Sequence, residues 1–276
     1  MTSKRWPALV FIAACLLGLP RPAGATVIAN STIEFKNLTI TPGTAYTLAG
    51  LWTLETFAHA DNNSPSQNSD DPQSGNSPGS IGSTATVTWA SAQGSASAPN
   101  NLPDLGIKGS GTSDVNIPGC GSAFVNSNGH GAVFGNPFDP SIDPPNFSFT
   151  IIGGTDPVDV TFSIDIAGSV NLMTDQCGLS ASTQTTFHLD VDGSPVLFDV
   201  EPFLIGPNDA LSAPISTHLS MTVPLDPGLH GLRLEADSES SGLNVVPEPP
   251  VGVLLLAGLA ALAAVRRRPV RLRLGA

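Results

Sequence analysis

Apolar and polar residues alternate along much of this chain with a period of two, which indicates β-strands with one buried face. The clearest alternation falls in residues 158–170, 183–191 and 215–225. In the first stretch Val160, Phe162 and Ile164 share one face, and Asp192-Gly193 after the second is a hairpin-turn signal. The pattern therefore predicts long antiparallel strands in the second half of the chain.

Weaker alternation predicts further short strands in two pieces of residues 26–41 and in residues 45–60, 81–98, 112–117, 122–126, 131–134, 146–152, 196–200 and 229–236. Residues 59–80 contain no large apolar side chain and are expected to form a flexible loop. About ten to twelve strands separated by turns predict an all-β fold. We expect residues 26–246 to form a single antiparallel β-sandwich, jelly-roll-like, with long loops.

The N-terminus has the order of parts of a secretory signal peptide. Lys4-Arg5 precedes an apolar run at 8–19, and Ala23 and Ala25 supply the small residues of a cleavage site. Residues 1–25 are thus an expected signal helix, removed after Ala25 and exported through the Sec translocon. Residues 12–15, Ile-Ala-Ala-Cys, also fit a lipoprotein box, but the sequence stays apolar after the cysteine instead of turning polar.

The C-terminus also has three parts. Val246-Pro247-Glu248-Pro249 precedes an uncharged apolar segment at 251–265, which Arg266-Arg267-Arg268 follows. As a helix that segment is ~22 Å long, short for a transmembrane helix unless the bilayer thins locally. The arginines are expected to stay cytoplasmic, with the large N-terminal part outside. The arrangement fits either a simple membrane anchor or a processing signal.

Together, the Pro-Glu-Pro motif, the short apolar helix and the arginine cluster resemble the PEP-CTERM sorting domain, over residues 247–276. This resemblance implies recognition by an exosortase, a membrane transpeptidase-like enzyme that cuts near Val246-Pro247-Glu248-Pro249. It also implies a Gram-negative bacterium that makes extracellular polysaccharide. The expected route is an inner-membrane intermediate held by the C-terminal helix, and then the cell surface or extracellular matrix.

Charge is distributed unevenly along the chain. Between Thr26 and Val246 there are 22 negative and three positive side chains, a net charge of −19 with neutral histidines. Such a surface repels nucleic acid and anionic membranes and attracts cations. The strong negative charge therefore excludes nucleic acid as an expected partner and favours a soluble exported domain.

Two cysteines remain after signal removal, Cys120 and Cys177. An even number of cysteines in an exported protein favours a disulfide between them. In the chain-entropy account, closing that loop would stabilise the fold by roughly 4 kcal/mol.

Candidate metal ligands are few. Asp190 and Asp192 begin a pattern like a calcium loop, but no downstream carboxylate completes the spacing of an EF-hand. The sequence therefore predicts no cofactor, with these two aspartates as weak calcium candidates. The histidines, at positions 59, 130, 188, 218 and 230, have no short metal-binding spacing and are expected to be ordinary surface residues.

No catalytic residue is predicted. Residues 75–79, Gly-Asn-Ser-Pro-Gly, match a nucleophile elbow as a string, but they lie in a polar region. In addition, Pro78 has no N–H to donate to an oxyanion. We therefore expect a non-enzymatic surface or matrix protein, associated with exopolysaccharide or biofilm.

Two alternatives stay open at this stage. A carbohydrate-binding module would need Tyr46, Trp52 or Trp89 exposed as a platform for sugar rings, although their strand positions favour burial. A secreted hydrolase would need a pocket where carboxylates or histidines converge.

Overall fold

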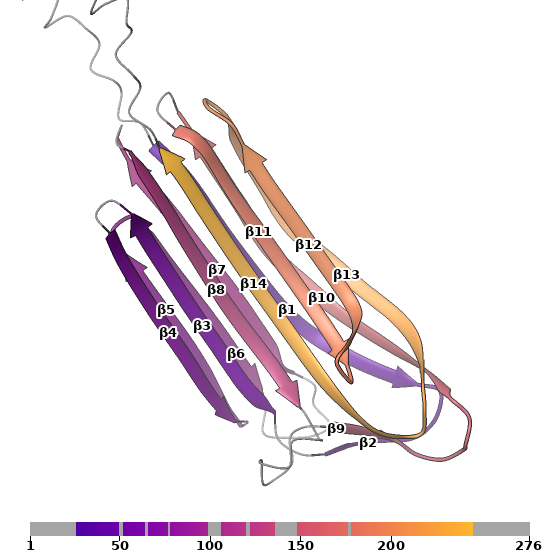
Figure 1. The fold of residues 1–276 in the computed structure, drawn as a ribbon. Coiled ribbons are helices and arrows are strands. Elements are labelled where there is room, and N and C mark those ends of the chain that lie inside the picture. The colour runs from indigo at the N-terminus through magenta and orange to yellow at the C-terminus, as the bar shows by residue number, and fades with distance from the viewer. Residues whose placement is uncertain are drawn as a thin grey trace, which may run out of the picture. The chain divides into compact units, whose positions relative to one another are not determined.

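The computed structural model describes residues 26–49, 52–63, 66–76, 78–98, 106–119, 122–135, 148–175 and 178–244 (Figure 1). Their regular structure consists entirely of β-strands, and all strand pairs are antiparallel. The predicted all-β, antiparallel class is therefore confirmed. The expected signal peptide at 1–25 and the expected sorting segment at 247–276, with the helix predicted in each, lie outside the described residues.

The first sheet, called sheet 1, has six strands in the order β13-β10-β1-β7-β6-β5. Their bounds are β13 (Ala210–Leu225), β10 (Val158–Thr174), β1 (Thr26–Pro42), β7 (Lys108–Pro118), β6 (Ala90–Ala98) and β5 (Gly79–Val87).

The second sheet, called sheet 2, has eight strands, six of them in the order β12-β11-β14-β8-β3-β4, while β9 pairs with β14 and β2 pairs with β9. Their bounds are β12 (Ser194–Ile205), β11 (Gly178–Val191), β14 (Gly228–Asn244), β8 (Ala123–Gly135), β3 (Thr53–Asn63), β4 (Ser66–Asn76), β9 (Ser148–Ile151) and β2 (Tyr46–Ala49). The buried sides of both sheets contribute to one hydrophobic core.

The strands with clear alternation follow the prediction. In β10, Val160, Phe162, Ile164 and Ile166 are all buried. The predicted turn at Asp192-Gly193 joins β11 to β12, with both residues at positive φ, as a tight hairpin turn requires.

The segment 59–80 is not a loop, so that prediction was wrong. It contains the end of β3, all of β4 and the start of β5, and β4 pairs with β3 along its whole length. Side chains of β4 also reach the edge of the other sheet, where Asp71 accepts a hydrogen bond from the Thr84 N–H (2.8 Å) and Gln67 accepts one from the Thr88 N–H (2.8 Å). Strand β4 is held in place by hydrogen bonds and not by buried apolar side chains. The hydrophobic pattern of the sequence therefore does not reveal it.

Other strands are longer than predicted. Residues 26–42 form one strand with a bulge at 36–39, where Asn37 has positive φ, instead of two short strands. The glycine-rich region holds two continuous strands, β7 and β8, in place of short strands between loops.

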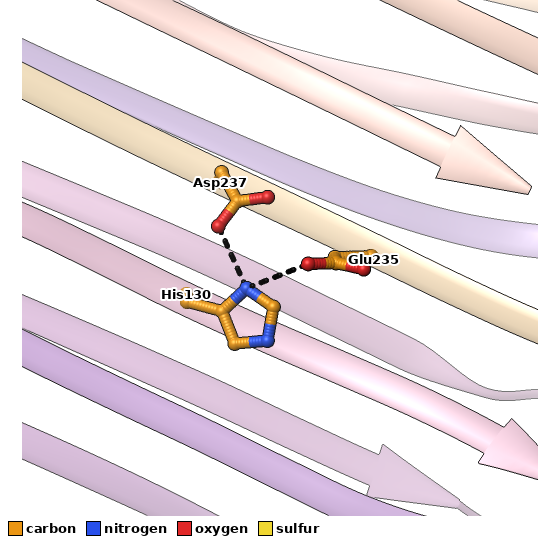
Figure 2. Close-up of side chains that lie close together, drawn as sticks. All are labelled: His130, Glu235 and Asp237. Carbon is orange, nitrogen blue, oxygen red and sulfur yellow. Dashed lines mark hydrogen bonds and ion pairs between the residues drawn. The ribbon is translucent and has the colours of Figure 1, made fainter. Parts of the chain in front are cut away.

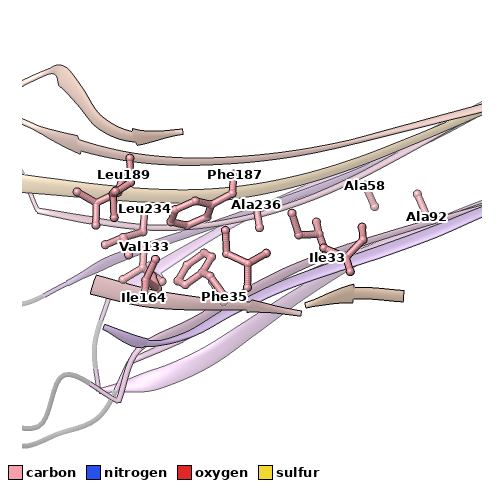
Figure 3. Packing of buried hydrophobic residues seen from close by; sticks show 14 of the residues in the cluster. Ile33, Phe35, Ala58, Ala92, Val133, Ile164, Phe187, Leu189, Leu234 and Ala236 are labelled. Carbon is pink, nitrogen blue, oxygen red and sulfur yellow. The ribbon is translucent and has the colours of Figure 1, made fainter. Parts of the chain in front are cut away.

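One half of the core is built from large side chains, and we call it the aromatic half. It lies between β10 and the second part of β1 on one side and β9, β11 and the first part of β14 on the other. Figure 3 shows Phe35 and Ile164 from the first side facing Phe187, Leu189 and Leu234 from the second. The Phe35 and Phe187 rings from opposite sheets are 5.7 Å apart, and the Phe149 and Phe162 rings are 5.9 Å apart. All four phenylalanines are fully buried, as the alternating pattern predicted for Phe162.

The other half, which we call the glycine half, lies between β6 and β7 of sheet 1 and β3 and β8 of sheet 2. Its inward positions carry mostly alanine, glycine and serine. A Cβ atom on Gly111 would lie 2.1 Å from the carbonyl oxygen of Gly129, and one on Gly94 would lie 2.0 Å from that of His130. The two backbones therefore pack directly against each other, with no room for a side chain.

A network of four buried serine hydroxyls joins the two sheets. Ser31 and Ser113 come from sheet 1, and Ser238 and Ser240 come from sheet 2. Their Oγ atoms are 2.7–3.3 Å apart. Because these polar groups bond one another, their burial does not carry the cost of unpaired hydroxyls.

At one end of the sandwich, four strand ends come together. Thr26 pairs with Pro118, Asn244 pairs with Gly178, and the Asn244 side-chain amide donates to the Gly119 carbonyl. The Thr26 N–H donates to Asp175 Oδ2 at 2.6 Å. Cys120 and Cys177 lie outside the described residues, so their disulfide stays a prediction.

Candidate functional site

The outer face of sheet 2 carries the principal cluster of chemically active side chains. His130 on β8 is directly opposite Asp237 on β14, and Glu235 lies two residues before Asp237. Since residues two apart on a strand point to the same side of a sheet, all three face outward together. Strand pairing alone thus places these side chains next to one another.

Both carboxylates of the cluster approach the same nitrogen of the imidazole ring. His130 Nδ1 is 2.7 Å from Asp237 Oδ1 and 3.5 Å from Glu235 Oε1 (Figure 2). The side chains are only 14%, 20% and 28% exposed for His130, Glu235 and Asp237. The cluster is therefore compact and partly shielded from water.

Two opposing influences act on the imidazole. Burial lowers the pKa of His130, whereas its hydrogen bond to Asp237 and the charges of Asp237 and Glu235 raise it. The positive charge of Arg233 opposes the carboxylates, and the balance is a raised pKa. Chemically, the arrangement either holds an imidazolium between two carboxylates or offers one nitrogen and two oxygens to a cation.

A second histidine on the same face has a different geometry. His59 Nδ1 is 2.6 Å from Asp70 Oδ1, but its other nitrogen, Nε2, is 3.8 Å from Asp61 Oδ2. The two carboxylates therefore lie on opposite sides of the ring and do not converge on one point.

The other histidines differ in exposure. His218 is exposed at 63%, as predicted, and its Nδ1 is 2.7 Å from Asp165 Oδ1. The ring of His188 contacts that of Phe198 at 4.5 Å. His230 is buried, so for this residue the prediction of a surface histidine was wrong. It is buried because β9 pairs with β14 there and the imidazole packs against the ring of Phe149, with centroids 5.1 Å apart.

The weak calcium candidates do not form a metal cluster in the described residues. Asp192 uses both carboxylate oxygens within the protein, accepting from the Gly231 N–H (2.8 Å) and contacting His230 Nδ1 (2.6 Å). Asp190 pairs across the sheet with Arg233. Among the residues that the structure describes, the group of three with metal-ligand geometry is His130, Glu235 and Asp237.

The aromatic residues proposed as a sugar platform are not exposed. Trp52 is buried, and Tyr46 and Trp89 are partly buried against the core. Gly75 and Gly79 of the elbow-like string lie at the end of β4 and the start of β5, in a connection between strands and without the following helix that an elbow needs.

The remaining predicted site residues lie outside the described ranges. They are Ala23 and Ala25 of the cleavage site, Cys120 and Cys177, the motif Val246-Pro247-Glu248-Pro249, and Arg266, Arg267 and Arg268. Within the described ranges there is no helix with the length and hydropathy needed to cross a membrane.

Sequence reasoning missed the His130 cluster. The sequence does show that Glu235 and Asp237, two residues apart, share one face of a strand. It does not show the contact with His130, which is 107 residues away from Asp237 in the chain. Only the pairing of β8 with β14 reveals the contact.

The comparisons with known proteins add no family to these observations. No protein-family model, curated protein or solved structure is significantly similar to this chain.

Proposed function

We propose that this chain is a non-enzymatic protein of the cell surface or extracellular matrix, exported through the Sec translocon and sorted by an exosortase. The observation that carries the proposal is the sequence at the two ends: the segment before Ala25 resembles a signal peptide, and the Pro-Glu-Pro motif with its apolar segment and arginine cluster follows from Val246. The described strands, from Thr26 in β1 to Asn244 in β14, all lie between the two expected cuts.

The compactness of the folded unit supports the C-terminal boundary. One compact unit ends at Val245, immediately before the motif. Removal of the signal peptide after Ala25 and a cut near Pro247-Glu248-Pro249 would leave all fourteen described strands intact. Both processing steps are therefore compatible with a stable released domain.

In this proposal, the mature part is a jelly-roll-like sandwich displayed by a Gram-negative bacterium after an inner-membrane intermediate. Its outer faces favour contact with exopolysaccharide, because hydroxyl side chains lie next to one another across strands of sheet 1. Thr39 and Ser163 are one such pair, with Oγ atoms 2.6 Å apart, and Ser95 and Ser110 are another, at 2.7 Å. Hydroxyl groups donate and accept hydrogen bonds, as sugar hydroxyls do.

The test is mass spectrometry of the protein's C-terminus in its native host, with and without the exosortase. We expect a C-terminus near Pro247-Glu248-Pro249 in the first strain and at Ala276 in the second. Substitution of Glu248 by Ala should block the cut, whereas the matched control Glu239→Ala, in the last strand, should not. A C-terminus at Ala276 in both strains would refute the sorting proposal.

A further inference from the structure

The His130 cluster has the ligand arrangement of a metal site. His130, Glu235 and Asp237 each offer one potential ligand atom, an imidazole nitrogen or a carboxylate oxygen, and these three atoms lie within 4.8 Å of one another. Zinc bonds to nitrogen and oxygen ligands are ~2.1 Å long, which places tetrahedral ligands ~3.4 Å apart. Small side-chain shifts therefore suffice for all three residues to bind one ion.

A neighbouring arginine fixes the orientation of one ligand. Arg233 Nη2 is 2.8 Å from Glu235 Oε2, and the other oxygen, Oε1, is the one that lies near His130. Carboxylates that bind metals are typically held by such outer hydrogen bonds. With a neutral imidazole, the two carboxylates and Arg233 leave a net charge of −1 to attract a cation.

The donor atoms select the class of metal. Calcium and magnesium prefer sites made of oxygen alone, whereas zinc binds imidazole nitrogen together with carboxylate oxygen. We propose that His130, Glu235 and Asp237 bind one divalent transition-metal ion, Zn²⁺ in the first instance, on the outer face of sheet 2. Three protein ligands leave one position of a tetrahedral ion open to water or to an outside ligand.

His59 provides a matched control on the same sheet face. It also has two carboxylate neighbours, but they lie at opposite ring nitrogens, Asp70 at Nδ1 and Asp61 at Nε2. One ion cannot bind both carboxylates and a single ring nitrogen in this geometry. If the acidic surface attracted cations only through its negative charge, the His59 and His130 sites would contribute equally to metal affinity.

The experiment measures Zn²⁺ affinity of the purified full-length protein by competition with a chromogenic chelator, in an excess of Ca²⁺. The wild type should bind one ion per chain in the presence of Ca²⁺. His130→Ala and the nearly isosteric Asp237→Asn should each weaken Zn²⁺ binding by roughly tenfold or more. His59→Ala should leave the affinity unchanged, and circular dichroism of each variant checks that its β-structure is retained.

Several results would overturn the metal site. They are an absence of Zn²⁺ binding by the wild type, displacement of Zn²⁺ by Ca²⁺ at similar concentration, or equal losses in the His59 and His130 variants. Unchanged affinity in a folded Asp237→Asn variant would also contradict it. None of these outcomes depends on export or on C-terminal processing, so the site and the proposed function fail independently.

Discussion

The two halves of the sandwich reach a packed interior by opposite means. In the aromatic half, large side chains such as Phe35 and Phe187 fill the space between the sheets. In the glycine half, Gly111 and Gly129 let the backbones meet with no side chain between them. The first half therefore gains stability chiefly from apolar burial, while the second relies on close fit. The aromatic half should therefore be sensitive to the loss of a large side chain, and the glycine half to the addition of a small one.

The largest expected effect is the loss of a ring from the aromatic half. Phe187→Ala should lower the free energy of unfolding by about 3–5 kcal/mol, since it removes buried apolar surface and leaves a cavity. Chemical denaturation measures the change. Phe198→Ala is the matched control, because that ring is 57% exposed on the outer face of sheet 2. If Phe187→Ala lowered the free energy of unfolding as little as Phe198→Ala does, the aromatic half would not be the closely packed region described above.

In the glycine half, the addition of a single methyl group should destabilise the fold. Gly111→Ala would place a Cβ 2.1 Å from a carbonyl oxygen of the opposite sheet. The sheets must then separate locally, at a cost of about 1–3 kcal/mol or more. Gly206→Ala, at a site with open space around it, should unfold like the wild type. A Gly111→Ala variant as stable as the wild type would show that the backbones are not in contact.

The smallest effect compares two aspartates on the outer face of sheet 1. Burial raises the pKa of Asp114 on β7, although a hydrogen bond with Ser91 opposes it. Hydrogen bonds from Asn37 and then His218 lower the pKa of Asp165 on β10. The two carboxylates should therefore make stability depend on pH in opposite directions.

The sign follows from proton binding to the folded and unfolded states. The contribution of Asp114 is present below the ordinary pKa of 3.8 and is lost as the pH rises through the raised value. The contribution of Asp165 is present above 3.8 and is lost as the pH falls through the lowered value. At pH 7, Asp114→Asn should raise the melting temperature and Asp165→Asn should lower it. Shifts in the same direction at pH 7 would contradict this assignment.

The contrast between the halves also explains what could be predicted from the sequence. Strands of the aromatic half have successive large apolar residues on the inward face, Val160 to Ile166 in β10 and Phe187 to Val191 in β11, and the predicted stretches 158–170 and 183–191 lie within the observed strands. In the middle of β7 and β8 the inward positions are glycine or serine (Gly109, Gly111 and Ser113; Ser127, Gly129 and Gly131), which in a sequence look like turn residues. The hydrophobic pattern therefore underestimates strands whose buried face carries almost no side chain.

The candidate site at His130 could not be predicted from the sequence for another reason. Alternation places Glu235 and Asp237 on one face, but it says nothing about which strand lies beside β14. The contact with His130 depends on strand order and on a register that a shift of one residue would destroy. Local patterns carry neither kind of information.

The hydrogen bond between the Thr26 N–H and Asp175 would change in character if the chain is cut after Ala25, as proposed above. Cleavage after Ala25 would turn the neutral amide of Thr26 into the α-ammonium group of the mature chain. Asp175 Oδ2, at 2.6 Å, would then face a positive charge, and a neutral hydrogen bond would become an ion pair. Signal-peptide cleavage would thus create an ion pair between β1 and Asp175. The N-terminal end of β1 would then be more stable in the mature protein than in its precursor.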